Sequence, residues 1–164
     1  MKKSAELVRG LKSGIVAGLI YGILYALLIT VLFQVVGPLL DVPVSAPIFG
    51  GSYVILSVNP FMAIIVGPIF GIILGLIYAF VYNRLPERKL GRWSVSSTKG
   101  AILALLVWLL LLLISIPTRL STTLFFSEFG QYQAFQIVMT LAALWLFLIL
   151  GIQLGYFWDR FKPK

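Results

Sequence analysis

Cysteine and histidine are both absent from the 164 residues of this chain. Without them there is no thiolate nucleophile, no disulfide, and no imidazole ligand for zinc or haem. Acidic residues are scarce as well, and none falls inside a long apolar run: Glu6, Asp41, Glu87, Glu128 and Asp159. The paired carboxylates and proton relays of membrane enzymes and charge-coupled carriers are therefore missing. We expect no catalytic residue, no metal site and no cofactor.

Charged residues of any kind are few. They make up 11% of the chain, against 60% hydrophobic residues. A soluble globular domain has roughly 45–50% apolar and about 25% charged residues. A single domain of this length cannot bury so much apolar surface away from water. The excess must face lipid, so the sequence predicts an integral membrane protein.

Hydropathy predicts an all-α fold with four transmembrane helices. We expect the spans at residues 14–36, 61–82, 100–117 and 134–158. At ~1.5 Å per residue the first covers about 34 Å, enough for a ~30 Å hydrocarbon core. The third is slightly short, and Pro117 is expected to kink its helix rather than end it. Residues 118–133 resemble an amphipathic surface segment, and the role of residues 37–60 stays open between a re-entrant piece and a cap on the bundle.

The beginning of the chain resembles a secretion signal, because basic residues precede an apolar run. A signal h-region is roughly 7–15 residues long, and this run is longer. Val44-Ser45-Ala46 is similar to a cleavage site, but Pro47 follows it directly. We expect the first span to be retained.

The cations are distributed unevenly about the predicted spans. Of the thirteen Lys and Arg residues, twelve fall on one side of the predicted membrane and only Arg119 falls on the other. The others are Lys2, Lys3, Arg9 and Lys12 before the first span, Arg84, Arg88, Lys89, Arg92 and Lys99 between the second and third, and Arg160, Lys162 and Lys164 after the fourth. Positive charge stays in the cytoplasm, so a cell-membrane protein with both termini inside is predicted.

The same cations explain the net charge of +8 without a nucleic-acid partner. Near a membrane surface each is worth about 1 kcal/mol of attraction to anionic lipid. The residues that we expect to contact lipid headgroups on the cytoplasmic side are Arg84, Arg88, Lys89, Arg92, Lys99 and Arg160. An acidic patch on a protein partner could take the place of the headgroups.

Small residues recur at every fourth position of the first two spans: Gly10, Gly14, Gly18, Gly22 and Ala26, then Ala63, Gly67, Gly71, Gly75 and Ala79. Positions four apart share a helix face, and GxxxG faces let helices in lipid approach closely. Gly14, Gly18, Gly22, Gly67, Gly71 and Gly75 are thus predicted helix-packing residues, with a crossing near −40°. Gly151 and Gly155 form a shorter row in the fourth span. A partner chain, or a narrow path, could use these faces instead.

The two halves of the chain, residues 1–86 and 96–163, resemble each other. Tyr82-Asn83-Arg84-Leu85 and Trp158-Asp159-Arg160-Phe161 end the second and fourth spans, each at the same distance from a glycine, Gly75 or Gly151. Two tandem helical hairpins of the same orientation are predicted. The alternative is that both spans simply end in an interfacial aromatic followed by Arg.

Two functions fit these patterns. The first is a non-catalytic accessory or structural subunit of a membrane complex, or a homo-oligomer, because reactive groups are missing and contact faces are present. The second is a small transporter or channel for a neutral solute, acting as an oligomer. Polar residues within the spans, such as Tyr21, Tyr25 and Gln153, would bond neighbouring helices in the first case and line a path in the second.

Overall fold

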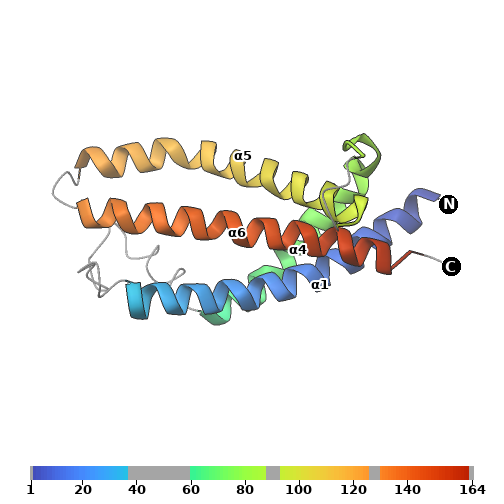
Figure 1. Ribbon diagram of the computed structural model, residues 1–164, viewed down its shortest axis with the longest axis horizontal. Helices are drawn as coiled ribbons and strands as arrows, with labels where there is room; N and C mark the ends of the chain where they lie inside the picture. The colour runs from blue at the N-terminus through green and yellow to red at the C-terminus, as the bar shows by residue number, and fades with distance from the viewer. Residues whose placement is uncertain (1, 37–59, 88–92, 126–129, 163–164) are drawn as a thin grey trace.

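The protein is described by a computed structural model that covers residues 2–36, 60–87, 93–125 and 130–162. These residues are almost entirely helical (Figure 1). Helix α1 (Lys2–Val31) continues into a π-helical turn at Leu32–Val36, and α4 (Pro60–Val81) into a 3-10 turn at Tyr82–Arg84. Helices α5 (Val95–Phe125) and α6 (Gly130–Arg160) are the remaining helices of the described residues.

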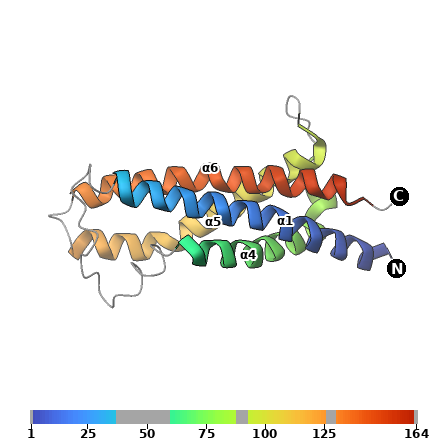
Figure 2. The ribbon, with the colours of Figure 1, turned by 90° about the horizontal axis from the view of Figure 1, so that it is seen from below.

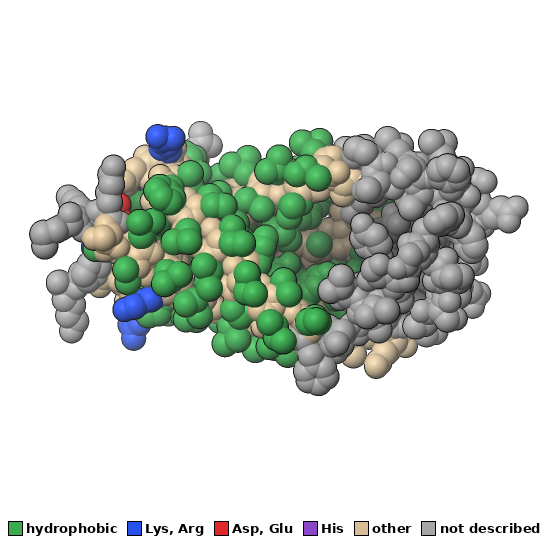
Figure 3. Space-filling model, turned by 180° about the vertical axis from the view of Figure 1, so that it is seen from behind, with side chains coloured by type: hydrophobic (Ala, Val, Ile, Leu, Met, Phe, Trp, Pro, Cys, Tyr) green, Lys and Arg blue, Asp and Glu red, His purple; other side chains and the backbone are tan. Residues whose placement is uncertain are grey.

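All four helices have the length and composition of membrane spans. The qualifying segments are Ser4–Val31, Met62–Arg84, Val95–Ser115 and Ile137–Arg160. Large apolar side chains cover the outer surface between the two ends, and the described Lys and Arg side chains on the face shown lie toward one end (Figure 3). The prediction of an all-α fold with four helices that are long and apolar enough to span a membrane is confirmed.

The helices pack in an order that differs from their order in the chain. Helix α1 packs most extensively on α4 and also on α6, and α6 packs on α5 (Figure 2). The beginning of α1 and the end of α6 lie at the same end of the bundle, which we call the terminal end. The start of α5 joins them there, because Ser96 contacts Asp159.

The core lies where α1, α4 and α6 meet and extends to the first turns of α5. It contains Ala17, Leu74, Tyr78, Ala79, Leu103, Leu150, Leu154 and Trp158. Small residues on α1 allow large side chains of α4 and α6 to interlock, which close packing requires. Tyr78 is fully buried, and Trp158 is 2% exposed. Both side chains therefore belong to the core.

Several predicted boundaries differ from the observed helices. Helix α5 starts at Val95 rather than at residue 100, and it continues through Pro117 to Phe125. A proline removes one backbone hydrogen bond, and the rest of a long helix can continue past it. Of the predicted segment 118–133, residues 118–125 continue α5 and residues 130–133 begin α6, while 126–129 lie outside the described residues. Of the segment 37–60, all but Pro60 lies outside the described residues.

Candidate functional site

The glycines of α1 and α4 face each other along the contact between the two helices. The closest pairs are Gly10 with Gly75, Gly14 with Gly71, and Gly18 with Gly67, so the helices run antiparallel. In each pair, a Cβ built on either glycine would overlap the carbonyl oxygen of the other. The hydrogen that occupies this position points at that oxygen, which is the geometry of a weak Cα–H···O contact.

No other residue fits these positions without moving the helices apart. A Cβ on Gly67 would stand 2.6 Å from Gly22 Cα, a backbone atom that cannot rotate out of the way. The structure brings Gly14, Gly18, Gly22, Gly67, Gly71 and Gly75 into one such interface within the chain.

Helices α5 and α6 meet through a shorter version of the same contact. Gly100 and Gly151 oppose each other's carbonyl oxygens, and a Cβ on Gly151 would stand 2.6 Å from Ala104 Cβ. In the sequence, Lys12-Ser13-Gly14 opens the first span as Lys99-Gly100 opens the third, and Gly75 corresponds to Gly151 before the similar helix ends. The partner of Gly14 is Gly71, however, so the second contact is shifted by four residues, about one helical turn.

Gly155 brings the first turn of α5 against α6. A Cβ on Gly155 would stand 2.5 Å from Ser97 Cα and would overlap the Ser96 carbonyl. Asp159 lies one turn further along α6, on the same face as Gly155. The close approach at Gly155 therefore puts the Asp159 carboxylate within reach of the Ser96 side chain.

Ser94 explains why α5 begins early enough to supply Ser96. The backbone N–H of Ser97 donates to Ser94 Oγ at 3.1 Å, and that of Thr98 donates to the Ser94 carbonyl at 3.0 Å. A serine hydroxyl that accepts from a residue in the first turn is a typical N-cap. Ser96 to Lys99 then become the buried first turns of the helix.

Ser96 is the centre of a polar cluster that we define as Arg9, Tyr78, Tyr82, Ser96 and Asp159. Its hydroxyl donates to Asp159 Oδ1 at 2.6 Å and lies 2.9 Å from the Tyr82 hydroxyl. A serine hydroxyl has one hydrogen, so Tyr82 must be the donor in the second bond. The Tyr78 hydroxyl donates to the Ser96 carbonyl at 2.6 Å. Side chains of α4 and its following turn are thus bonded to α5, and α5 to α6.

Arg9 adds α1 to this cluster. Its Nη2 atom lies 3.8 Å from Asp159 Oδ1, and its Nε donates to the Trp158 carbonyl. The guanidinium also lies 4.3 Å from the centre of the Trp158 ring, where a cation is attracted to the aromatic face. Asp159 therefore contacts Ser96 of α5 and Arg9 of α1.

Trp158 is held between the cluster and the core. Its ring makes an edge contact with Tyr78 at 5.2 Å and a tilted contact with Tyr82 at 5.0 Å between ring centres. Its Nε1 is buried and has no hydrogen-bond partner among the described residues. The aromatic contacts and the cation of Arg9 position the indole, rather than a bond to its N–H.

Lys99 is a buried cation beside the cluster. Its side chain is 1% exposed, and its Nζ donates to the Tyr82 carbonyl at 3.1 Å and to Glu87 Oε1 at 3.2 Å. The ammonium lies 4.3 Å from the centre of the Tyr82 ring. Lys99 was expected to contact lipid headgroups, but its bonds hold the start of α5 to the turn after α4. The sequence places it next to a glycine, so the backbones come close enough to bury it.

The other predicted headgroup contacts are distributed as follows. Arg84 and Arg160 are exposed at the terminal end. Arg88, Lys89 and Arg92 lie outside the described residues.

An aromatic cluster occupies the middle of the bundle. Tyr21 stacks on Tyr25 at 5.8 Å and contacts Phe70 and Phe147 at 6.0 and 5.8 Å between ring centres. On α6, the Oε1 atom of Gln153 is buried and has no hydrogen-bond partner among the described residues. None of these side chains carries a formal charge, so they can pack against a neutral molecule without an ion pair.

The polar cluster can couple the positions of four helices, because each of its bonds runs between different elements. Within the described part of the chain, no three His, Cys, Asp or Glu side chains come together as metal ligands. Sequence reasoning missed Ser96, Tyr78 and Arg9 as members of a cluster. Ser94 followed three residues later by Ser97 is the signal that could have placed the start of α5, and Ser96 with it.

No protein-family model, no curated protein and no solved structure matches this chain.

Proposed function

We propose that this chain is a non-catalytic multi-pass component of the cell membrane, acting as an accessory or structural subunit of a larger complex or as a homo-oligomer. One observation supports this most directly. The bonds of the polar cluster and of Lys99 join helix to helix at the terminal end. Groups used in this way position helices, and none is left in a pair that could perform acid–base chemistry.

We place the terminal end in the cytoplasm. Arg9, Lys12, Arg84, Arg160 and Lys162 all belong to segments at that end, and cations near the ends of spans remain on the cytoplasmic side. The α1–α4 and α5–α6 contacts then correspond to two tandem hairpins, each closed by glycines.

The glycine faces are occupied within the chain, so a partner has to use another surface. The outer side of α5 supports this role, because its leucines are broadly exposed: Leu106 (53%), Leu110 (56%) and Leu113 (60%). These side chains cost nothing in lipid, and they also pack well against a neighbouring helix.

Chemical cross-linking in native membranes, followed by purification in mild detergent, tests this proposal. We expect one membrane protein, or a second copy of the chain, in fixed ratio. The double variant Leu110→Ala, Leu113→Ala should lower its recovery, whereas Ile69→Ala, Ile73→Ala on the exposed side of α4 should not. A chain that stays monomeric and uncross-linked in both native membranes and detergent would contradict the proposal.

A second function is favoured by Gln153 of α6, whose Oε1 is buried without a partner among the described residues. A neutral solute that passes through the bundle could bond to this amide. Flux of a small neutral solute into liposomes that contain only this chain, abolished by Gln153→Leu but not by Gln34→Leu, would favour this function over the first.

A further inference from the structure

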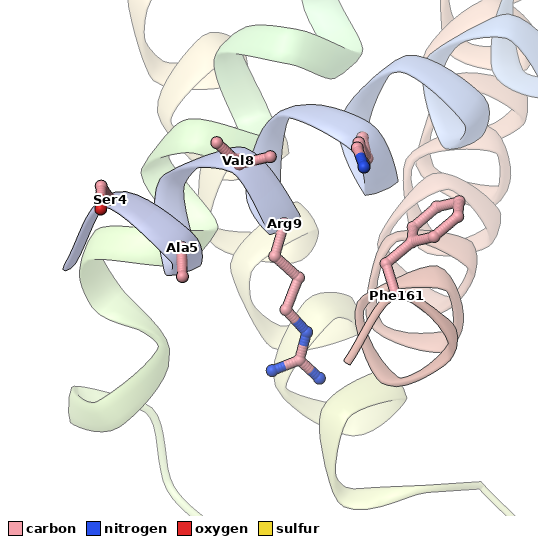
Figure 4. A pocket seen from close by; sticks show the side chains of 6 residues that line it. Ser4, Ala5, Val8, Arg9 and Phe161 are labelled. Carbon is pink, nitrogen blue, oxygen red and sulfur yellow. The ribbon is translucent and has the colours of Figure 1, made fainter. Parts of the chain in front are cut away.

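A hollow opens at the terminal end between the beginning of α1 and the residue that follows α6. It is lined by Ser4, Ala5, Val8, Arg9, Lys12 and Phe161 and has a volume of about 410 Å³ (Figure 4). The first five residues share one face of α1, and Phe161 forms the opposite wall. None of the described residues that line it is acidic.

The lining combines two cations with an apolar wall. Arg9 and Lys12 are three positions apart on α1, so their side chains start ~5–6 Å from each other. Ala5, Val8 and Phe161 supply hydrocarbon beside them. An anionic phospholipid complements this lining, because its phosphate is negatively charged and its acyl chains are hydrocarbon.

The two cations differ in their contacts with the rest of the protein. Arg9 directs Nε at the Trp158 carbonyl and Nη2 toward Asp159, which fixes the guanidinium at the wall of the hollow. A guanidinium has five N–H donors, so Arg9 has more donors than these two contacts use. Lys12 is exposed and forms no ion pair with any described residue.

We infer that this hollow binds the phosphate of an anionic glycerophospholipid. Lys12 supplies the free charge, Arg9 supplies the preorganised donors that guanidinium offers to phosphate, and Phe161 supplies an apolar contact to the glycerol and the start of the acyl chains. Lys99 cannot serve in this way, because its side chain is buried and bonded to Glu87. The site needs no protein partner, so its failure would leave the proposed function untouched, and the reverse holds too.

Native mass spectrometry of the full chain in mild detergent tests the site, with phosphatidylglycerol, diacylglycerol and inorganic phosphate as probes. We expect phosphatidylglycerol to bind, diacylglycerol not to bind, and millimolar inorganic phosphate not to displace the lipid. Lys12→Gln should weaken phosphatidylglycerol binding about fivefold, the effect of one cation near a membrane surface, and Lys12→Arg should restore it. Arg84→Gln removes an exposed cation away from the hollow and should change binding much less.

A variant that leaves the charge unchanged tests the hollow itself. Ala5→Trp should fill it and weaken binding as Lys12→Gln does, while Leu11→Trp, at an exposed position of α1 that does not line the hollow, should not. Equal binding in Lys12→Gln and the unmodified chain, or equal losses in Lys12→Gln and Arg84→Gln, would overturn the site. Displacement by inorganic phosphate alone would overturn the lipid as its ligand.

Discussion

The Ser96 hydroxyl donates to Asp159 Oδ1 across 2.6 Å, although 63 residues separate the two in the chain. Gly155 makes this possible by letting the α5 backbone approach α6 one turn before Asp159. Tyr82 donates to the same hydroxyl, and Arg9 lies against the same carboxylate oxygen. The Ser96 side chain therefore links α5 to α6 through Asp159 and to the turn after α4 through Tyr82. It is linked to α1 through the contact of Asp159 with Arg9.

Removing that hydroxyl should loosen the terminal end. Ser96→Ala leaves Tyr82 without its acceptor and Asp159 without its donor, so we expect a loss of about 1–2 kcal/mol in the free energy of unfolding. Equilibrium unfolding in mixed detergent micelles measures it.

A double-mutant cycle that combines Ser96→Ala with Asp159→Ala tests whether this loss of stability comes from the bond between the two side chains. Two residues in one network should show a coupling of at least ~0.5 kcal/mol. Arg160→Ala, at the exposed neighbouring position, is the control and should show none. Strictly additive losses for Ser96→Ala and Asp159→Ala would mean that their bond does not stabilise the bundle.

The α1–α4 contact should tolerate no added methyl group. Gly71→Ala places a Cβ against the Gly14 carbonyl and 2.5 Å from Gly18 Cα, so the helices must separate. Such overpacking costs about 1–3 kcal/mol. Unfolding of the variant in detergent should show this loss, whereas Ile73→Ala, on the exposed side of α4, should change stability by less than about 0.5 kcal/mol. If Gly71→Ala and Ile73→Ala are equally stable, the close glycine contact does not exist.

Lys99 should react as a buried amine. An amine-specific acylating reagent, applied to the folded protein in detergent and followed by peptide mass analysis, should modify Lys12 and Lys162 but leave Lys99 largely unmodified. The reason is that the Lys99 ammonium is enclosed by Tyr82 and Glu87. Modification of Lys99 should rise to the level of the other two after denaturation in SDS. Equal modification before denaturation would show that Lys99 is free at the surface.

The helices and the glycine faces could be predicted from the sequence because both depend on local patterns. Apolar runs long enough to cross a bilayer and glycines four apart are visible without knowing which segments meet. The antiparallel register of α1 on α4 follows once both rows are aligned. The one-turn shift between the two glycine contacts could not be predicted, because the similar ends of the halves indicate a common register.

The polar cluster could not be predicted, for a physical reason. Serine and tyrosine cost little near a membrane interface, so Ser96 and Tyr78 do not stand out as buried lysines or carboxylates would. Arg9 and Asp159 were assigned to the interface from their positions at helix ends. Their bonds depend on how four separate helices meet, which no local pattern records.

The orientation of the terminal end is the most direct test of this account. Cysteine labelling can measure it, because the chain has no cysteine of its own and each introduced cysteine is the single labelling site. Asn83→Cys and Lys162→Cys occupy exposed positions at the terminal end, and Ser52→Cys lies in the segment expected on the opposite side. With a membrane-impermeant maleimide on intact cells, we predict labelling of Ser52→Cys alone, and of the other two only after permeabilisation. Labelling of Asn83→Cys and Lys162→Cys in intact cells would contradict the account.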